Sequence, residues 1–92
     1  MYELKTKLEE LLAEAKVCKE KNLVDKTILY MYGAEYEKWL EDSRAFVSQN
    51  FGNDEEGKEF LKESIGANGN RVQVFENLVV LLQSIYSRLA WR

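Results

Sequence analysis

The chain has 92 residues, of which 46% are apolar and 32% charged, and its net charge is −3. This balance excludes a disordered chain, and the lack of a basic stripe interleaved with aromatic residues argues against direct nucleic-acid binding. The length predicts a single helical domain, residues 1–92. The chain contains no proline, which favours long uninterrupted helices.

The first predicted helix spans the segment ELKTKLEELLAEAKVCKEKN. Its opposite face alternates Glu and Lys, as expected for a surface in contact with water, and Asn22 suits the C-cap. The apolar residues recur at steps of four and three, which is the spacing of a bundle or coiled-coil seam. They are Leu4, Leu8, Leu11, Ala15 and Cys18.

A second helix is predicted over residues 26–50, with Asp25 as its N-cap. Gly33 interrupts the apolar pattern, so either another backbone packs closely there or the helix bends or breaks. We expect Tyr36 and Trp39 to pack in the core with their polar atoms at its edge. The remaining apolar residues that recur at helical spacing are Ile28, Met31, Tyr32, Leu40, Phe46 and Val47.

A corner follows the second helix. Gly52 suits a left-handed C-cap, and Asn53 or Asp54 suits the N-cap of a short third helix. Acidic residues 54–56 would lie in the first turn of that helix, where they complement the helix dipole. The side chains expected to face inward from it are Phe60, Leu61 and Ile65.

The segment GANGN, residues 66–70, predicts a loop, and Asn70 with Gln73 resembles a capping box at the start of a last helix over residues 71–90. This helix is the most hydrophobic one. Its main apolar stripe consists of Phe75, Leu78, Leu82, Ile85 and Leu89. The predicted fold is therefore all-α: a compact four-helix bundle with a short third helix and up-and-down topology, built around the second and last helices.

The residue inventory argues against an enzyme and against a bound metal or cofactor. The chain has no histidine, which is the usual general base and the commonest metal ligand. The Glu-x-x-His pairs of a ferritin-like site are absent, and DEEGKEFLKE lacks the alternating acidic positions of a calcium loop. Cys18 falls on the apolar stripe of the first helix, so we interpret it as a core residue and not as a nucleophile.

One region resembles small helical segments at the N-termini of bacterial proteins, many of them uncharacterised and some linked to phage defence. In those segments a helix with a Trp-centred stripe ends in a Phe-Gly corner, followed by an acidic cap and a short helix. The resemblance implies a non-catalytic module that precedes or regulates an effector, and it assigns no functional residue. It rests on Trp39-Leu40, Ala45-Phe46-Val47, Phe51-Gly52, Asp54 and Phe60.

The apolar helix faces exceed what one small bundle needs. The leading prediction is therefore a non-catalytic protein-interaction or self-association module, with a protein partner and a homodimer as the expected assembly. We expect a regulatory part of a bacterial, phage-defence-type system. The predicted interface residues are Leu4, Leu8, Leu11, Tyr30, Tyr86 and Trp91.

The alternative is a small acidic inhibitor or adaptor, encoded by a phage or plasmid, that docks on a basic partner. Residues 35–63 hold nine acidic residues against four basic ones, and the candidate acidic surface consists of Glu37, Glu41, Asp54, Glu55 and Glu59. The sequence has no signal peptide and no apolar run long enough to span a bilayer. A cytoplasmic location without membrane contact is therefore expected.

Overall fold

The computed structural model describes residues 2–25 and 28–90. These residues are mostly helical, as predicted, but they also form a small two-stranded antiparallel sheet. In chain order the elements are α1 (Tyr2–Asn22), β1 (Leu23–Asp25), β2 (Leu29–Met31), α2 (Ala34–Phe51), α3 (Glu55–Glu63) and α4 (Val72–Ala90).

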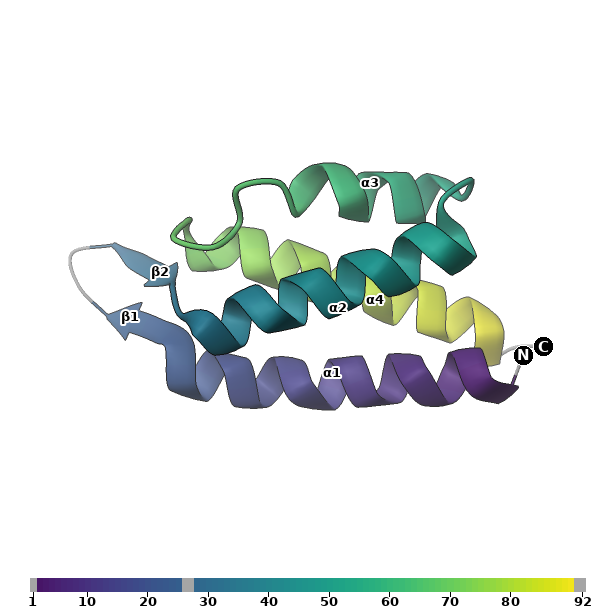
Figure 1. The fold of residues 1–92 in the computed structure, drawn as a ribbon, viewed down its shortest axis with the longest axis horizontal. Coiled ribbons are helices and arrows are strands. Elements are labelled where there is room, and N and C mark those ends of the chain that lie inside the picture. The colour runs from purple at the N-terminus through teal and green to yellow at the C-terminus, as the bar shows by residue number, and fades with distance from the viewer. Residues whose placement is uncertain (1, 26–27, 91–92) are drawn as a thin grey trace.

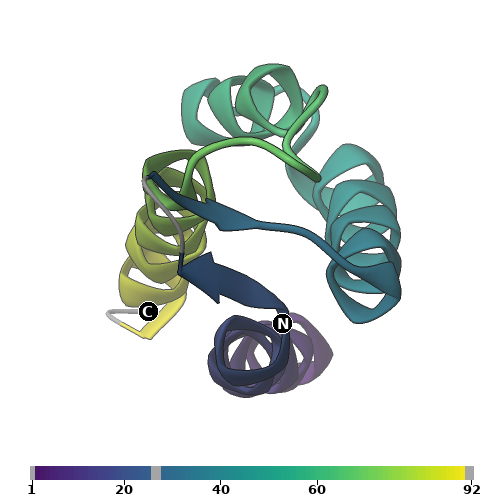
Figure 2. The ribbon, with the colours of Figure 1, turned by 90° about the vertical axis from the view of Figure 1, so that its left-hand side faces the viewer.

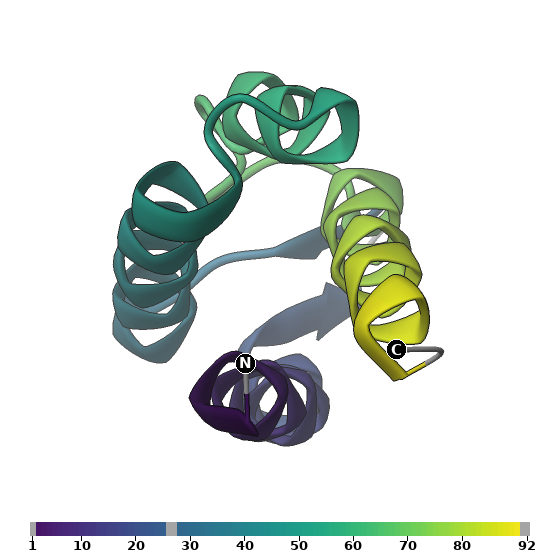
Figure 3. The ribbon, with the colours of Figure 1, turned by 90° about the vertical axis from the view of Figure 1, so that its right-hand side faces the viewer.

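The helices lie side by side along the long axis of the molecule, and consecutive helices point in opposite directions (Figure 1). Seen along that axis they form a ring in chain order (Figure 2 and Figure 3). In this ring α1 and α3 each pack against both α2 and α4. The β-hairpin closes the end of the ring that lies opposite the start of α1 and the end of α4 (Figure 1).

The seam predicted for α1 faces the centre of the ring. Leu8 and Leu11 have no exposed surface, and Ala15, Cys18 and Asn22 are also buried. This burial supplies the main stabilisation of α1, because a charged helix with so narrow an apolar stripe depends on tertiary packing. The inner stripe of α4 meets it in the same core with Phe75, Leu78, Leu82 and Ile85.

Trp39 of α2 contacts all three other helices. Its indole Nε1 donates a hydrogen bond to the Leu11 carbonyl oxygen in α1, at 2.8 Å. Its ring lies 6.5 Å from that of Phe60 in α3 and 5.5 Å from that of Phe75 in α4, measured between centroids. Tyr36 stacks beside it at 6.1 Å. Packing of Trp39 and Tyr36 in the core agrees with the sequence prediction, but their polar atoms do not lie at its edge. The hydrogen bond of the Trp39 indole is buried, and the Tyr36 hydroxyl is buried without a hydrogen-bond partner among the described residues.

The second helix begins later than predicted, because residues 23–25 and 29–31 form two paired strands. Asp25 pairs with Leu29 in the register of the two strands and does not cap a helix. β2 is also bonded on its other side: the Met31 amide donates to the Asn70 carbonyl at 3.0 Å, and the Gly69 amide donates to the Met31 carbonyl at 2.7 Å. These backbone bonds with a distant loop favour a strand where the side-chain pattern alone predicts a helix.

Gly33 connects the hairpin to α2 and has a φ of 155°. A Cβ atom at this position would lie 1.7 Å from Asn22 Oδ1, so a larger residue at position 33 would displace the Asn22 side chain. Asn68 holds the connection from the loop side, since its Oδ1 accepts a hydrogen bond from the Gly33 amide at 3.2 Å. Of the two alternatives for Gly33, the helix break occurs, since α2 begins at Ala34, and the close neighbour is the side chain of Asn22 and not another backbone.

One prediction about the corner is wrong, and the predicted N-cap is confirmed in its position only. Gly52 lies in the right-handed helical region and not in the left-handed one. Asp54 does occupy the N-cap position of α3, yet its side chain makes no capping hydrogen bond and instead binds Arg88. In the bond to Arg88 both the donor and the acceptor are charged, which favours it over the capping bond to a backbone amide.

Two predictions near the loop are also wrong. Ile65 follows the C-cap of α3 and is 72% exposed, so it does not face inward as Phe60 does. The expected capping box is absent, because Asn70 Oδ1 accepts from the Arg71 amide while Gln73 bonds to Asn77.

We expect Trp39→Phe to lower the free energy of unfolding by about 1–3 kcal/mol, because it removes one buried hydrogen bond and part of the largest core ring. Urea denaturation followed by far-ultraviolet circular dichroism would measure this. Tyr32→Phe is the control, since Tyr32 is 64% exposed and its replacement should change stability by less than about 0.5 kcal/mol. Equal effects of the two changes would contradict the central role of Trp39.

We expect Gly33→Ala to cost about 1–3 kcal/mol of stability through the clash with Asn22 and the backbone strain. Gly66→Ala is the matched control for strain alone, because Gly66 has a φ of 69° and no atom within 4 Å of an added Cβ. Thermal denaturation of both variants gives the comparison. In an Asn22→Ala background, the cost of Gly33→Ala should fall toward that of Gly66→Ala; an unchanged cost would rule out the clash.

Candidate interaction surface

The outer face of α4 carries a row of residues at steps of four and three. We call this row the α4 ridge: Gln73, Asn77, Val80, Ser84 and Ser87. The ridge is polar except at its centre, where Val80 is 57% exposed. An exposed valine on a helix that also has a complete inner stripe is not required for the core.

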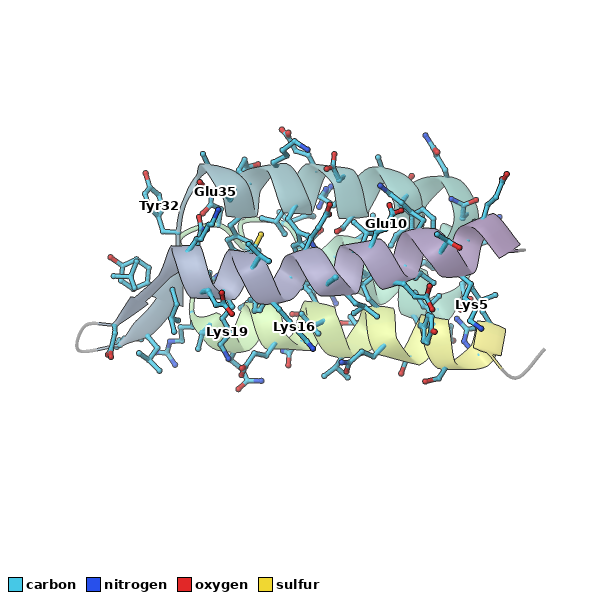
Figure 4. The ribbon with its side chains drawn as sticks, turned by 90° about the horizontal axis from the view of Figure 1, so that it is seen from below. Lys5, Glu10, Lys16, Lys19, Tyr32 and Glu35 are labelled. Atoms are coloured by element: carbon cyan, nitrogen blue, oxygen red, sulfur yellow. The ribbon has the colours of Figure 1, made fainter. Side chains whose placement is uncertain are left out.

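A groove runs between the ridge and α1. It encloses about 500 Å³, and its apolar lining consists of Leu12, Ala15, Phe75, Val79 and Val80. Lys16 and Lys19 form the α1 rim of this groove, and both lie on the side of α1 that faces α4 (Figure 4). Lys19 Nζ lies 2.8 Å from Glu76 Oε2, so an ion pair crosses the groove between the two helices.

A smaller groove of about 260 Å³ lies on the other side of the ridge, between α3 and α4. Glu59 and Glu63 of α3 line it together with Asn77, Val80 and Leu81. Asn77 and Val80 therefore line both grooves, so the two grooves lie at the same level along α4. The ridge separates a basic rim on α1 from an acidic rim on α3.

Arg88, near the C-terminal end of α4, ties that helix to the start of α3. Its guanidinium Nη2 lies 2.6 Å from Asp54 Oδ2 and 2.8 Å from Glu56 Oε1. The hydrogen bond to Asp54 and the charge of Glu56 raise the pKa of Arg88 above its usual value. One guanidinium thus offsets part of the negative charge of these two carboxylates.

The interface predicted from the sequence does not form one surface. Leu8 and Leu11 are fully buried in the core and Leu4 packs against it, so in this structure the stripe of α1 serves internal packing. Tyr30 lies half-buried in β2, at the hairpin end. Trp91 lies outside the described residues.

Tyr86, the other predicted interface residue, lies half-buried in α4 and is engaged with α1. Its hydroxyl donates to Glu9 Oε2 at 2.7 Å, and Lys5 Nζ lies 5.9 Å from its ring centroid. The hydrogen bond to Glu9 raises the pKa of Tyr86. These contacts stabilise the α1–α4 pair, which again leaves little of the predicted interface free.

The predicted acidic surface is also divided. Glu37 Oε1 accepts a hydrogen bond from Asn68 Nδ2 at 2.9 Å, and Asp54 binds Arg88. Glu59 faces the α3–α4 groove, whereas Glu37 lines a separate hollow between α2 and residues 64–68. The remaining two members, Glu41 and Glu55, are exposed.

Sequence reasoning missed the α4 ridge because the apolar run LVVLL reads as core throughout. The sequence nevertheless contained a signal for an exposed valine. The five ridge positions recur at steps of four and three, as one face of a helix does, and four of them are polar, so the fifth, Val80, is expected on the same outward face. A second exposed apolar group, formed by Ile28, Leu29 and Tyr32, lies on and beside the hairpin.

Neither a metal centre nor a membrane span is found in the part of the chain that the structure describes. Within it, no three Cys, Asp or Glu side chains are grouped so that they could hold a metal ion. None of its helices combines the length and the apolar character needed to cross a bilayer. Comparisons with protein-family models, curated proteins and solved structures find no match to this chain.

Cys18 is 5% exposed, and its Sγ lies 3.6 Å from the Glu35 carbonyl oxygen. Burial raises the pKa of the thiol, and the nearby charges of Glu14 and Glu35 raise it further. The thiolate, which is the nucleophilic form, is therefore disfavoured. This environment fits the interpretation of Cys18 as a core residue.

We expect Cys18 in the folded protein to react with iodoacetamide at least about tenfold more slowly than in concentrated urea, at about pH 8. Mass spectrometry of timed samples measures this.

Because folding raises the pKa of Cys18, its contribution to stability is complete below the pKa of the unfolded chain and is lost as pH rises through the folded value. At alkaline pH the free energy of unfolding should therefore fall less steeply with rising pH in Cys18→Ala than in the original chain. Equal slopes of the two curves would contradict the raised pKa of Cys18.

Proposed function

We propose that this protein is a non-catalytic helical module for protein interaction or self-association, and that it binds through the α4 ridge and the two grooves beside it. The observation that carries the proposal is the exposure of Val80 between two grooves whose outer rims have opposite charge. An apolar centre with a polar, charged rim is the usual anatomy of a protein interface.

Two kinds of residue, apolar and charged, would contribute to binding at this surface. Burial of Val80 and of the half-exposed Leu12 and Val79 would supply the driving force, because apolar area removed from water is stabilising. The charges of Lys16 on one side and Glu59 on the other would set the orientation of the partner.

We also assign the fold to the up-and-down four-helix bundles. The alternating helix directions and the ring in which α1 contacts both α2 and α4 support this assignment. The regulatory role in a bacterial system and the cytoplasmic location remain predictions from the sequence. The acidic-adaptor alternative is weaker, since Arg88 binds Asp54 and the other carboxylates face different sides.

A photocrosslinking experiment tests the proposal. A benzoylphenylalanine residue at position 80 should yield crosslinked products in cells that produce the protein, because this side chain would lie inside the interface. The matched control is the same residue at position 17, since Val17 is a similarly exposed valine on α1, outside both grooves. Equal crosslinking at the two positions, or none at position 80, would refute the proposal.

A further inference from the structure

Three charged residues beside the α4 ridge make no ion pair within the described residues. On the α1 side, Lys19 is satisfied by Glu76, but Lys16 is not paired. On the α3 side, neither Glu59 nor Glu63 forms an ion pair. These charges flank one apolar residue, Val80, at the same level along α4, so the molecule carries complementary charges on the two sides of one exposed helix.

We propose that the partner of this surface is a second copy of the chain, and that the two α4 ridges pack side by side and parallel around a two-fold axis that runs along them. This inference rests on the proposed function and specifies its partner.

Charge selects the parallel arrangement. A two-fold axis along the ridge exchanges the two sides of the interface and keeps the level along the helix unchanged. Lys16 of each copy then lies opposite Glu59 and Glu63 of the other. With an axis across the ridge, in contrast, Lys16 would face Lys16 and the carboxylates would face each other. Like charges brought together in an interface are unfavourable, so the parallel pair is preferred.

The shape of the ridge permits this contact. Its residues follow the four-three spacing of a helix–helix seam, so each would meet its own counterpart in a parallel pair. Val80 would then pack on Val80 at the centre, and the small side chains of Ser84 and Ser87 allow close approach. Asn77 would pair with Asn77, and a polar Asn in such a seam favours one register.

Charge exchange between two variants tests the arrangement. In a homodimer, Lys16→Glu places a carboxylate opposite Glu59 and Glu63 at both contacts, and the pair of changes Glu59→Lys and Glu63→Lys places lysines opposite Lys16. We expect each variant alone to dimerise at least about tenfold more weakly than the original chain. An equimolar mixture of the two should restore dimerisation, because both contacts of the heterodimer then join opposite charges.

Light scattering after gel filtration, over a concentration series at low and high salt, measures these equilibria. Lys21→Glu is the matched control, since it changes the net charge equally on α1 but lies outside both grooves. It should leave dimerisation unchanged. A variant that carries all three changes, Lys16→Glu, Glu59→Lys and Glu63→Lys, separates the two arrangements, because in a parallel pair it should dimerise with itself and not with the original chain. If it instead dimerises with the original chain and not with itself, the arrangement is antiparallel and the parallel pair is wrong.

Disulfide crosslinking provides a second, independent measurement. In a parallel pair Asn77→Cys and Ser84→Cys should each form a disulfide with its own copy. In an antiparallel pair centred on Val80, residue 77 would face residue 84, about 10 Å away from its own counterpart, so only a mixture of the two variants would crosslink. The original chain is the control, because its buried Cys18 should not react.

The outcomes separate this inference from the proposed function. If the original chain stays monomeric at all concentrations but position 80 crosslinks to a different protein, the second copy is wrong and the interaction module stands. If position 80 crosslinks to nothing, both fail. A dimer whose strength is the same in Lys16→Glu as in the original chain would show self-association through another surface and would overturn this geometry.

Discussion

The fold depends on the contacts that Trp39 makes from the middle of α2. Its indole N–H reaches the backbone of α1 at Leu11, and its ring packs against Phe60 of α3 and Phe75 of α4. A single side chain therefore fixes the distances between four helices. Aromatic rings suit this position because they bury a large area and lose little conformational freedom, which matters in a chain whose small core leaves a narrow margin of stability.

This central packing determines which helix faces are left for other molecules. The stripes of α1 and α4 are both drawn toward the aromatic cluster, so Leu8 and Leu11 become interior residues. What remains on the outside of α4 is the ridge with Val80, bounded by one groove on each side. The candidate interaction surface is thus a consequence of how the core is filled.

Backbone contacts close the end of the ring at which the hairpin lies. β2 is bonded to β1 on one side and to residues 69 and 70 on the other. Asn22 and Asn68 approach Gly33 from α1 and from the loop, so three separate segments meet at one residue. These polar contacts give the hairpin a defined position although much of its apolar surface is exposed.

The sequence by itself determined α1, the short acidic start of α3, the loop at 66–70 and α4, because each is specified by local periodicity or by turn residues such as Gly66 and Gly69. It also identified Trp39 and Cys18 as core residues. Only the tertiary structure decided the hairpin, since Met31 bonds to Asn70, a residue far away in the chain. The interaction surface was likewise beyond the sequence. A periodic pattern shows that Leu8 and Val80 are apolar, but only the packing of other helices decides that Leu8 is enclosed and Val80 is left at the surface.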